Sequence, residues 1–356
     1  QLAEKTGIPV ITTIMGKGAL PTNHPLYVGN LGIHGSYAAN TAISECDVLF
    51  SIGVRFNDRI TGRVNEFAKK AAIIHVDIDP ASISRNIVVD IPIVADAKNA
   101  IVALLEKTPN YDFADWKKQI DSWKTKYPLG NIYGVKSKVT PFSIIQEINR
   151  VFEDAVITTD VGQNQLWTTQ FLELTDKKQM LTSGGLGTMG YGLPAAIGAK
   201  IGNPDKDVIA ICGDGGIQMN IQEMATAVVY ELPVIICILN NGYLGNVRQW
   251  QEMFYKKRYS CTCLRYRKSC ATFCNTPSAS CPEYIPDFVR LAESYGAKAF
   301  RVQRPEDIKT TLEEAKGTKK VPTVIEFIID PEENVLPIVP PGNPLSDMIM
   351  GGAGND

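Results

Sequence analysis

Short runs of apolar and β-branched residues alternate along the chain with longer stretches in which apolar residues recur every three or four positions. The short runs predict buried strands, and the longer stretches predict helices that cover a sheet. Such alternation is typical of a parallel sheet with helical crossovers, so the expected fold class is α/β. The predicted strands are 8–13, 47–52, 72–77, 91–94, 155–159, 207–212, 234–239 and 323–329.

The same pattern predicts two open parallel-sheet domains joined by a linker. We expect the first domain at residues 1–108 and the second at 138–336. Residues 109–137 form the predicted linker, which carries one charged helix, and the Pro- and Gly-rich residues 337–356 form a C-terminal tail. Within the second domain, the apolar spacing over 217–230 predicts one helix that faces the sheet.

Composition excludes several classes of protein. The 356 residues have a formal net charge of −2, which leaves no basic field for nucleic acid. No apolar run reaches the length of a membrane span, so we expect no membrane insertion. The 8 cysteines occur without a secretory segment and read as reduced thiols. We therefore expect a cytoplasmic protein, from a bacterium.

Two polar motifs follow neighbouring predicted strands. Gly213-Asp214-Gly215-Gly216 ends the strand 207–212, and Asn240-Asn241-Gly242-Tyr243 ends the strand 234–239. Ligands of open parallel sheets gather beyond the carboxyl ends of the strands. A carboxylate and a carboxamide suit Mg²⁺, and glycines before a helix let a phosphate approach the backbone. Together the motifs predict a metal-bridged diphosphate, whereas Gly-Asp-Gly alone is more typical of a helix cap.

The spacing of these motifs resembles that of thiamin diphosphate enzymes. Four further segments resemble the large subunit of acetolactate synthase, namely Asp160-Val-Gly-Gln163, Gly184 to Gly198, Gly242-Tyr-Leu-Gly245 and Arg248-Gln-Trp-Gln251. Three others are similar to the FAD-binding central domain of that family, namely Met15-Gly-Lys-Gly18, Leu31-Gly-Ile-His-Gly35 and Gly53 to Arg59. The resemblance covers nearly the whole chain. It implies a transferase that decarboxylates pyruvate and joins the remainder to pyruvate or 2-oxobutyrate, in the biosynthesis of valine, leucine and isoleucine.

The resemblance also implies roles for single residues in the second domain. Asp214, Asn241 and the Tyr243 carbonyl would hold Mg²⁺. Met189 would support the bent cofactor, although a methionine outside this motif reads as core filler. The implied thiamin diphosphate contacts are Gly162, Gln163, Asn164, Gly187, Met189, Gly213, Asp214, Gly215, Gly216, Asn241 and Gly245.

Substrate and flavin residues are implied in the same way. Trp250 would choose the acceptor, Asn246 would line the substrate channel where methionine is common, and Arg59 would contact a carboxylate unless it forms a surface ion pair. FAD would have a structural role, because carboligation moves no electrons in or out. The implied FAD contacts are His34, Gly53, Arg55, Asp77, Ile78 and Asp96.

A cysteine-rich insert at residues 259–285 departs from the family. Its thiols include Cys263, Cys270, Cys274 and Cys281, which suggests a metal or iron–sulfur site. The insert lacks a Cys-x-x-Cys pair, so a solvated loop of reduced thiols is the alternative.

Quaternary structure and completeness also follow from the resemblance. It implies a homodimer or tetramer and a small regulatory subunit. No segment matches the N-terminal domain that holds the activating glutamate, so we expect a fragment that is inactive alone. The rival readings are a pyruvate oxidase-like enzyme that uses FAD and thiamin diphosphate, and a nucleotide-binding module without catalysis.

Overall fold

The computed structural model describes residues 1–130, 137–271, 274, 278 and 280–351. The chain forms two compact units. The first unit combines Gln1–Ile132 with Leu336–Asp356, and the second unit spans Tyr133–Val335.

The second unit is built on a six-stranded sheet in which every strand pair is parallel, as the sequence predicted. The strand order is β10-β11-β9-β8-β6-β7. Strands β7 and β10 were missed by the prediction because they are the half-exposed edge strands, so their sequences lack a continuous apolar run. The strands are β6 (Ala155–Thr159), β7 (Gln179–Thr182), β8 (Asp207–Gly213), β9 (Ile235–Asn240), β10 (Lys298–Val302) and β11 (Thr323–Ile328).

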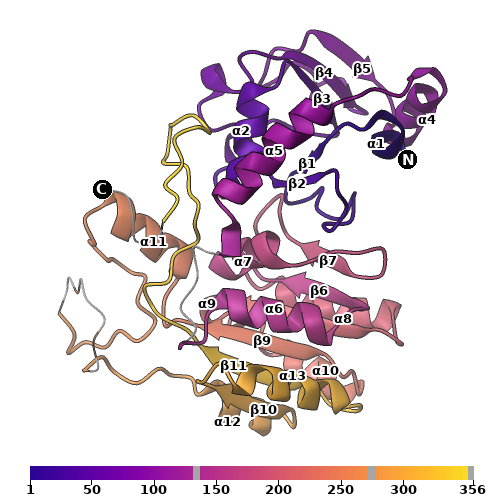
Figure 1. Cartoon of the computed structure of the whole chain (residues 1–356). Helices are drawn as coiled ribbons and strands as arrows, with labels where there is room; N and C mark the ends of the chain where they lie inside the picture. Colours follow the sequence, from indigo (N-terminus) through magenta and orange to yellow (C-terminus); the bar gives the residue numbers. More distant parts are fainter. Residues whose placement is uncertain (131–136, 272–273, 275–277, 279, 352–356) are drawn as a thin grey trace. The chain divides into compact units, whose positions relative to one another are not determined.

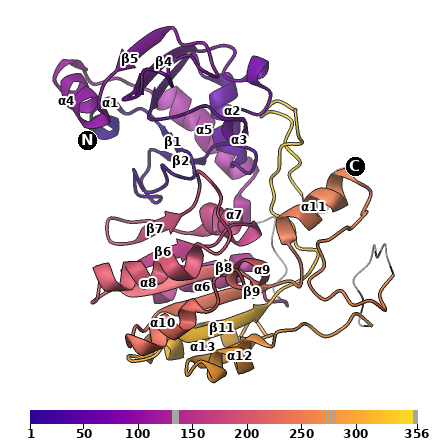
Figure 2. The ribbon, with the colours of Figure 1, turned by 180° about the vertical axis from the view of Figure 1, so that it is seen from behind.

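Helices cover both faces of this sheet. Helices α6 (Pro141–Val151) and α13 (Asp307–Gly317) lie on one face, and α8 (Gly192–Gly202) and α10 (Glu223–Val229) on the other (Figures 1 and 2). Helix α6 begins with a reciprocal cap, in which the Thr140 hydroxyl accepts from the Ser143 N–H at 3.1 Å. The remaining helices are α7 (Gln163–Phe171), α9 (Asp214–Ile217), α11 (Gly245–Phe254) and α12 (Phe288–Ser294).

The single helix predicted over 217–230 is wrong. The structure has two shorter helices there, α9 and α10, joined by a turn. In the turn, the Asn220 side chain donates to the Gly190 carbonyl at 2.9 Å. This bond ties the turn to the glycine-rich loop 183–191 and interrupts the helix where the apolar spacing would continue it.

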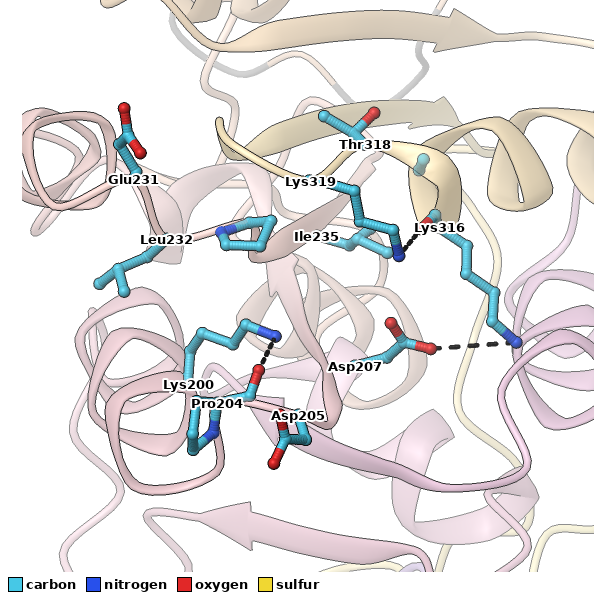
Figure 3. A pocket seen from close by; sticks show the side chains of 12 residues that line it. Lys200, Pro204, Asp205, Asp207, Glu231, Leu232, Ile235, Lys316, Thr318 and Lys319 are labelled. Carbon is cyan, nitrogen blue, oxygen red and sulfur yellow. Dashed lines mark hydrogen bonds and ion pairs between the residues drawn. The ribbon is translucent and has the colours of Figure 1, made fainter.

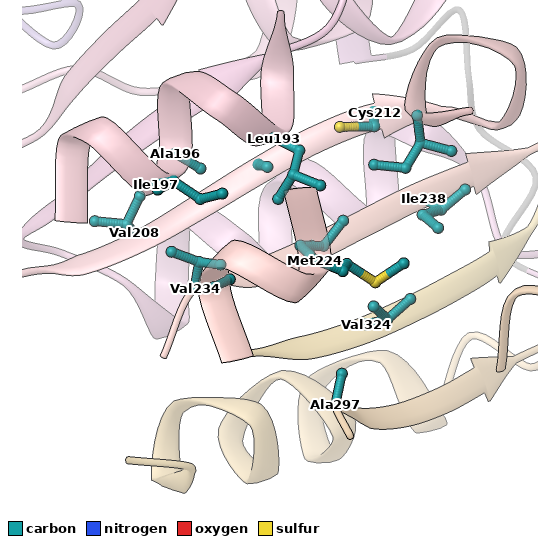
Figure 4. Close-up of a cluster of buried hydrophobic side chains, with 14 of the residues drawn as sticks. Leu193, Ala196, Ile197, Val208, Cys212, Met224, Val234, Ile238, Ala297 and Val324 are labelled. Atoms are coloured by element: carbon teal, nitrogen blue, oxygen red, sulfur yellow. The ribbon is translucent and has the colours of Figure 1, made fainter. Parts of the chain in front are cut away.

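One core cluster fills the space between the sheet and α8, α10 and α12 (Figure 4). Leu193 and Ile197 of α8 lie there with Val208 of β8, Met224 of α10 and Ile238 of β9. All five side chains are less than one tenth exposed. Burial of this kind is the main stabilising contribution to an α/β unit, and it holds the strands that carry the polar motifs in register.

The first unit contains two smaller parallel sheets. Strands β1 (Val10–Thr12) and β2 (Tyr27–Asn30) form one, and β3 (Val48–Ile52), β4 (Ala72–Asp77) and β5 (Ile91–Val94) form the other in the order β3-β4-β5. The helices are α1 (Leu2–Thr6), α2 (Tyr37–Glu45), α3 (Asp58–Thr61), the 3₁₀ turn η1 (Val64–Glu66), α4 (Ala97–Lys107) and α5 (Ala114–Lys126).

The structure divides the chain differently from the predicted domain boundaries. The predicted linker helix exists as α5, but it packs within the first unit, where Ile120 is buried beside Val28 and Ala39. The predicted tail also joins this unit, because Val339 and Leu345 lie in its core. Both segments bury apolar side chains against residues far away in sequence, and local composition does not report such packing.

None of the helices within the described ranges combines the length and apolar character that a membrane crossing requires.

We expect Leu193→Ala to destabilise the second unit by about 2–5 kcal/mol, because it leaves a cavity in a close-packed cluster. Ile201 lies on the same helix with 62% of its surface exposed, so Ile201→Ala is the matched control and should change the free energy of unfolding by less than about 0.5 kcal/mol. Urea unfolding followed by circular dichroism measures both. Equal losses in the two variants would contradict the assignment of this core.

A second prediction concerns pH and the first unit. Burial lowers the pKa of His75, whose side chain is fully buried beside Phe56. The unfolded chain therefore binds a proton that the folded chain rejects, so stability should fall as pH drops below about 6.5. Thermal unfolding from pH 8 to pH 5 should show a smaller loss in His75→Phe than in the unaltered chain. An identical pH profile for both proteins would show that His75 does not carry the effect.

Candidate functional site

The strand order places three polar segments at one edge of the six-stranded sheet. Strand β6 lies between β7 and β8. The connection from β6 leads to β7 on one side of it, and the connection from β7 leads back past β6 to β8 on its other side. Such a reversal opens a crevice beyond the carboxyl ends of the two central strands. The segments 160–164, 213–216 and 240–245 follow β6, β8 and β9 and meet there.

Asp214 is a buried carboxylate at the centre of this edge. Its Oδ2 accepts from the Gly242 N–H at 2.8 Å and its Oδ1 from the Gly215 N–H at 3.1 Å. Burial raises the pKa of Asp214 to about 7, despite these backbone donors. The Tyr284 hydroxyl, from the cysteine-rich insert, is a further hydrogen-bond neighbour that sequence reasoning missed. No ion pair to Asp214 occurs within the described ranges.

Asn241 lies beside Asp214 and is also buried. Its Oδ1 accepts from the Tyr243 N–H at 3.0 Å. This bond closes a turn after β9 that places the backbone beside the carboxamide. Its Nδ2 donates to Gln163 Oε1 at 3.1 Å. An amide oxygen has two lone pairs, so one remains on Oδ1 after the bond from Tyr243.

These groups fit a magnesium–diphosphate pair. A buried carboxylate without a cationic partner gains from a nearby divalent ion, and Asp214 keeps lone pairs beyond the two used by Gly242 and Gly215. Carboxylate, carboxamide and backbone carbonyl oxygens are ligands that Mg²⁺ accepts beside phosphate oxygens. Gly216 also leaves no room for a side chain, because a Cβ there would lie 2.4 Å from Asp160 Oδ1.

Asp160 holds the glycine-rich loop at this edge, a role that sequence reasoning did not assign. Its fully buried carboxylate accepts from the Gly190 N–H at 3.0 Å and from the Gly192 N–H at 3.2 Å. Met189 precedes this anchored glycine and is half-buried. The available signal was an acid at the end of a strand of small and β-branched residues, Ala155–Thr159, because a buried acid must find donors.

Asn164 has a different position from the one its predicted role suggests. Its Nδ2 donates to the Asp160 carbonyl at 3.0 Å and to the Ile211 carbonyl at 2.9 Å. Both amide hydrogens are therefore used to join the ends of β6 and β8. Only its oxygen remains, and a Cβ on Gly162 or Gly213 would lie 3.2 or 3.3 Å from it.

Helix α11 presents the predicted substrate residues together. Asn246 and Trp250 are separated by four positions and share one helical face, where both are partly buried. The Asn246 Oδ1 atom is buried, and no described residue forms a hydrogen bond with it. Arg248 fixes the helix, because its fully buried guanidinium pairs with Glu252 at 2.6 Å and donates to the Asn334 side chain.

The predicted flavin residues lie in the first unit, mostly at one sheet edge. Gly53 and Arg55 follow β3. Asp77 is the last residue of the neighbouring strand β4, and Ile78 follows it. The carboxylate of Asp77 accepts from the Asp79 N–H at 2.9 Å. Ile78 is 70% exposed, which leaves an apolar side chain open beside the turn.

The other first-unit residues have recognisable local roles. Asp96 follows β5 and caps α4, accepting from the Asn99 N–H at 3.1 Å. His34 Nδ1 lies 3.2 Å from the Pro337 carbonyl. Arg59 has an exposed side chain, and its carbonyl accepts from the Ile33 N–H at 2.9 Å.

The four-cysteine site is not assembled in the structure. Cys270 Sγ accepts from the Arg267 N–H at 3.4 Å, and Cys281 Sγ accepts from the Ser278 N–H at 3.3 Å. Among the residues that the structure describes, no three His, Cys, Asp or Glu side chains lie close enough to hold a metal ion. Cys263 and Cys274, the other two predicted ligands, therefore join no such cluster. Cys270 and Cys281 thus bond to backbone groups of the loop, whereas the Cys263 thiol forms a hydrogen bond with the Tyr243 side chain.

A hollow of about 360 Å³ opens at the opposite edge of the sheet, around the first residues of β8 and β9 (Figure 3). Lys200 there donates to the carbonyls of Pro204 and Lys206, and Lys319 donates to that of Lys316. Three lysines line the hollow, and so do Asp205, Asp207 and Glu231. Because these charges balance and the ammonium groups already have partners, the candidate site is the carboxyl edge.

Two family models match the chain. A family model described as the C-terminal TPP binding domain of thiamine pyrophosphate enzymes matches residues 160–327. The model of the central domain of these enzymes matches residues 1–104.

Several acetolactate synthase large subunits are similar to the chain. The probable large subunit of Methanocaldococcus jannaschii is 45% identical over 98% of this chain and 57% of its own length. Those of Cyanidium caldarium and Corynebacterium glutamicum are 43% and 42% identical, over 57% and 54% of their lengths. The chain thus spans little more than half the length of these relatives. The two family models match the chain in the order central domain and then C-terminal domain, and the relatives align with nearly the whole chain. The chain therefore belongs to the thiamine pyrophosphate enzymes, in the family of acetolactate synthase large subunits.

Proposed function

We propose that the polypeptide carrying this chain is an acetolactate synthase. It would decarboxylate pyruvate and join the two-carbon remainder to a second 2-oxo acid, pyruvate or 2-oxobutyrate, in the biosynthesis of branched-chain amino acids. The observation that carries the proposal is the buried carboxylate of Asp214, which forms no ion pair with any described residue. It lies beside Asn241, whose side-chain oxygen keeps one lone pair, in the domain that the family model matches.

The proposed site divides the work between the cofactor and the protein. Thiamin diphosphate supplies the carbanion and the electron sink for decarboxylation when it is bound. Asp214, Asn241 and the Tyr243 carbonyl hold Mg²⁺, which anchors the diphosphate. The glycines at 213, 215 and 216, at the start of α9, would let the diphosphate approach the backbone.

Two further devices position the reacting groups. The Asp160 carboxylate fixes the loop that presents Met189, so that this side chain supports the cofactor ring. Trp250 and Asn246 line the acceptor side from one face of α11, with the helix held by Arg248. Orientation of this kind lowers the barrier by removing freedom before the reaction.

The first unit is proposed to bind FAD as a structural cofactor, through Gly53, Arg55, Asp77 and Ile78 with Asp96 and His34 nearby. Arg59 is proposed to contact a substrate carboxylate. The relatives are called large subunits, and this name supports a small regulatory partner. A homodimer or tetramer is also proposed. No disulfide joins the cysteines of the described ranges, which fits the proposed cytoplasmic location.

Asp214→Ala should abolish acetolactate formation, because it removes the charged metal ligand. The polypeptide that carries this chain is assayed with thiamin diphosphate, Mg²⁺, FAD and pyruvate, with and without 2-oxobutyrate. Asp214→Asn keeps a hydrogen-bond acceptor for the Gly242 N–H, so it should fold even if Asp214→Ala does not. It should also lose activity, because it lacks the negative charge. Asp205→Ala, an exposed acid at the other edge, is the control and should retain activity.

Product identity separates the proposal from its rival. Acetolactate from the unaltered polypeptide supports the synthase. Carbon dioxide with peroxide or acetyl phosphate, and without acetolactate, would support an oxidase. Full activity in both Asp214 variants would remove the metal assignment.

Trp250→Leu should reduce the preference for 2-oxobutyrate over pyruvate, because the indole face no longer contacts the additional methyl group. A contact of this size is worth about 1–3 kcal/mol, so the ratio of the two products should shift by about 10-fold or more. Competition between the two acceptors in one reaction measures the ratio. Phe254→Leu, which alters the ring that packs edge-on against Trp250 at 5.6 Å, is the matched control and should shift the ratio less. An unchanged ratio in Trp250→Leu would contradict the role of Trp250.

A further inference from the structure

Three buried carboxamides form a continuous hydrogen-bonded chain that ends at the proposed metal site. Gln249 Oε1 accepts from Gln163 Nε2 at 2.9 Å, and Gln163 Oε1 accepts from Asn241 Nδ2 at 3.1 Å. The three side chains are at most 4% exposed. They come from α11, from the first turn of α7 and from the turn after β9, so the chain joins three separate elements.

The backbone of Val335 fixes the direction of this chain. The Val335 N–H donates to Gln249 Oε1 at 2.9 Å, and Gln249 Nε2 donates to the Val335 carbonyl at 2.9 Å. A backbone N–H needs an acceptor and a carbonyl needs a donor, so the Gln249 amide can be placed in only one of its two orientations.

This orientation passes along the chain. Gln249 presents its oxygen to Gln163, so Gln163 must present its nitrogen in return. The second hydrogen on Gln163 Nε2 points to the Glu333 carbonyl at 3.1 Å. Gln163 Oε1 therefore faces Asn241 and binds its nitrogen, which leaves the Asn241 oxygen on the side of Tyr243 and Asp214. An inverted Asn241 amide would offer hydrogens where a metal ion needs an oxygen.

Gly245 has a role in the same chain. A Cβ at this position would lie 2.1 Å from Gln163 Oε1 and 2.6 Å from Asn241 Nδ2. Any side chain would therefore separate these two groups. The glycine at the start of α11 is required by the carboxamide chain itself.

We propose that Gln249 is a positioning residue, which orients the metal-binding oxygen of Asn241 through Gln163. This inference rests on the proposed function, because it concerns the same metal site. Both side-chain hydrogens of Gln163 are used, by Gln249 and by the Glu333 carbonyl, so its side chain has no donor left for a phosphate. Gln163 thus acts on the metal through Asn241, and its part in binding the diphosphate is left to its backbone.

The test measures the affinity for Mg²⁺ in the polypeptide that contains these 356 residues. Mg²⁺ is titrated at saturating thiamin diphosphate, by calorimetry and by the half-saturation of product formation. Residues that orient a metal ligand affect affinity by about 10–100-fold, so Gln249→Ala should raise the Kd for Mg²⁺ by at least about 10-fold. Excess Mg²⁺ should restore most of kcat, because the ligands themselves remain.

Two further variants make the result specific. Gln163→Glu keeps the size of the side chain but removes both donors, so it should raise the Kd in the same range. It decides the question if Gln249→Ala does not fold. Gln251→Ala, two positions along the same helix, alters a side chain that bonds only to Ser260 and Thr262 among the recorded contacts of described residues and should leave the Kd unchanged.

Three outcomes would count against the idea. A Kd within twofold of the unaltered value in folded Gln249→Ala and Gln163→Glu would overturn the positioning role. A loss of kcat that excess Mg²⁺ does not restore would indicate a merely structural residue and overturn it also. If the unaltered polypeptide binds thiamin diphosphate without any dependence on Mg²⁺, the proposed function fails first, and this result is distinguishable from the other two.

Discussion

A buried carboxylate without a cation is the constraint on which the carboxyl edge of the second unit depends. Burial raises the pKa of Asp214 to about 7, so the protein stabilises its charge only in part. The backbone donors of Gly215 and Gly242 bend toward this group, and they shape the turns after β8 and β9. A bound divalent ion would supply the missing charge. The raised pKa of this buried acid and its proposed use as a metal ligand thus have the same cause, namely burial without a cationic partner among the described residues.

Carboxamides and backbone groups surround that acid and give the edge its geometry. Asp160 gathers the glycine-rich loop through N–H donors, and Asn164 joins the ends of β6 and β8. Gln249 and Gln163 set the orientation of Asn241. Each of these side chains is buried and hydrogen-bonded, so each has few alternative conformations. Preorganisation of this kind lets a small cofactor bind without reordering its surroundings.

Most of the fold was predictable because strands buried on both faces have a local signature. The runs ending at Thr159, Cys212 and Leu239 are apolar almost throughout, and all three proved to be central strands. Edge strands β7 and β10 were not predicted, since polar residues such as Gln179 and Lys298 dilute their pattern. The break between α9 and α10 was also missed, because it depends on a bond from Asn220 to a loop 30 positions earlier.

The sequence by itself determined the fold class and the principal candidate ligands, because strand periodicity and the residues that end a strand are local properties. It placed Asp214 and Asn241 at one sheet edge through the general geometry of parallel strands. Only the tertiary structure decided which unit helix α5 and residues 336–351 join, and that no three cysteine thiols of the described residues form a metal-binding cluster. It alone decided the direction of the carboxamide chain from Val335 to Asn241. Those features depend on contacts between residues distant in sequence, and the side-chain pattern of one segment contains no record of its partners.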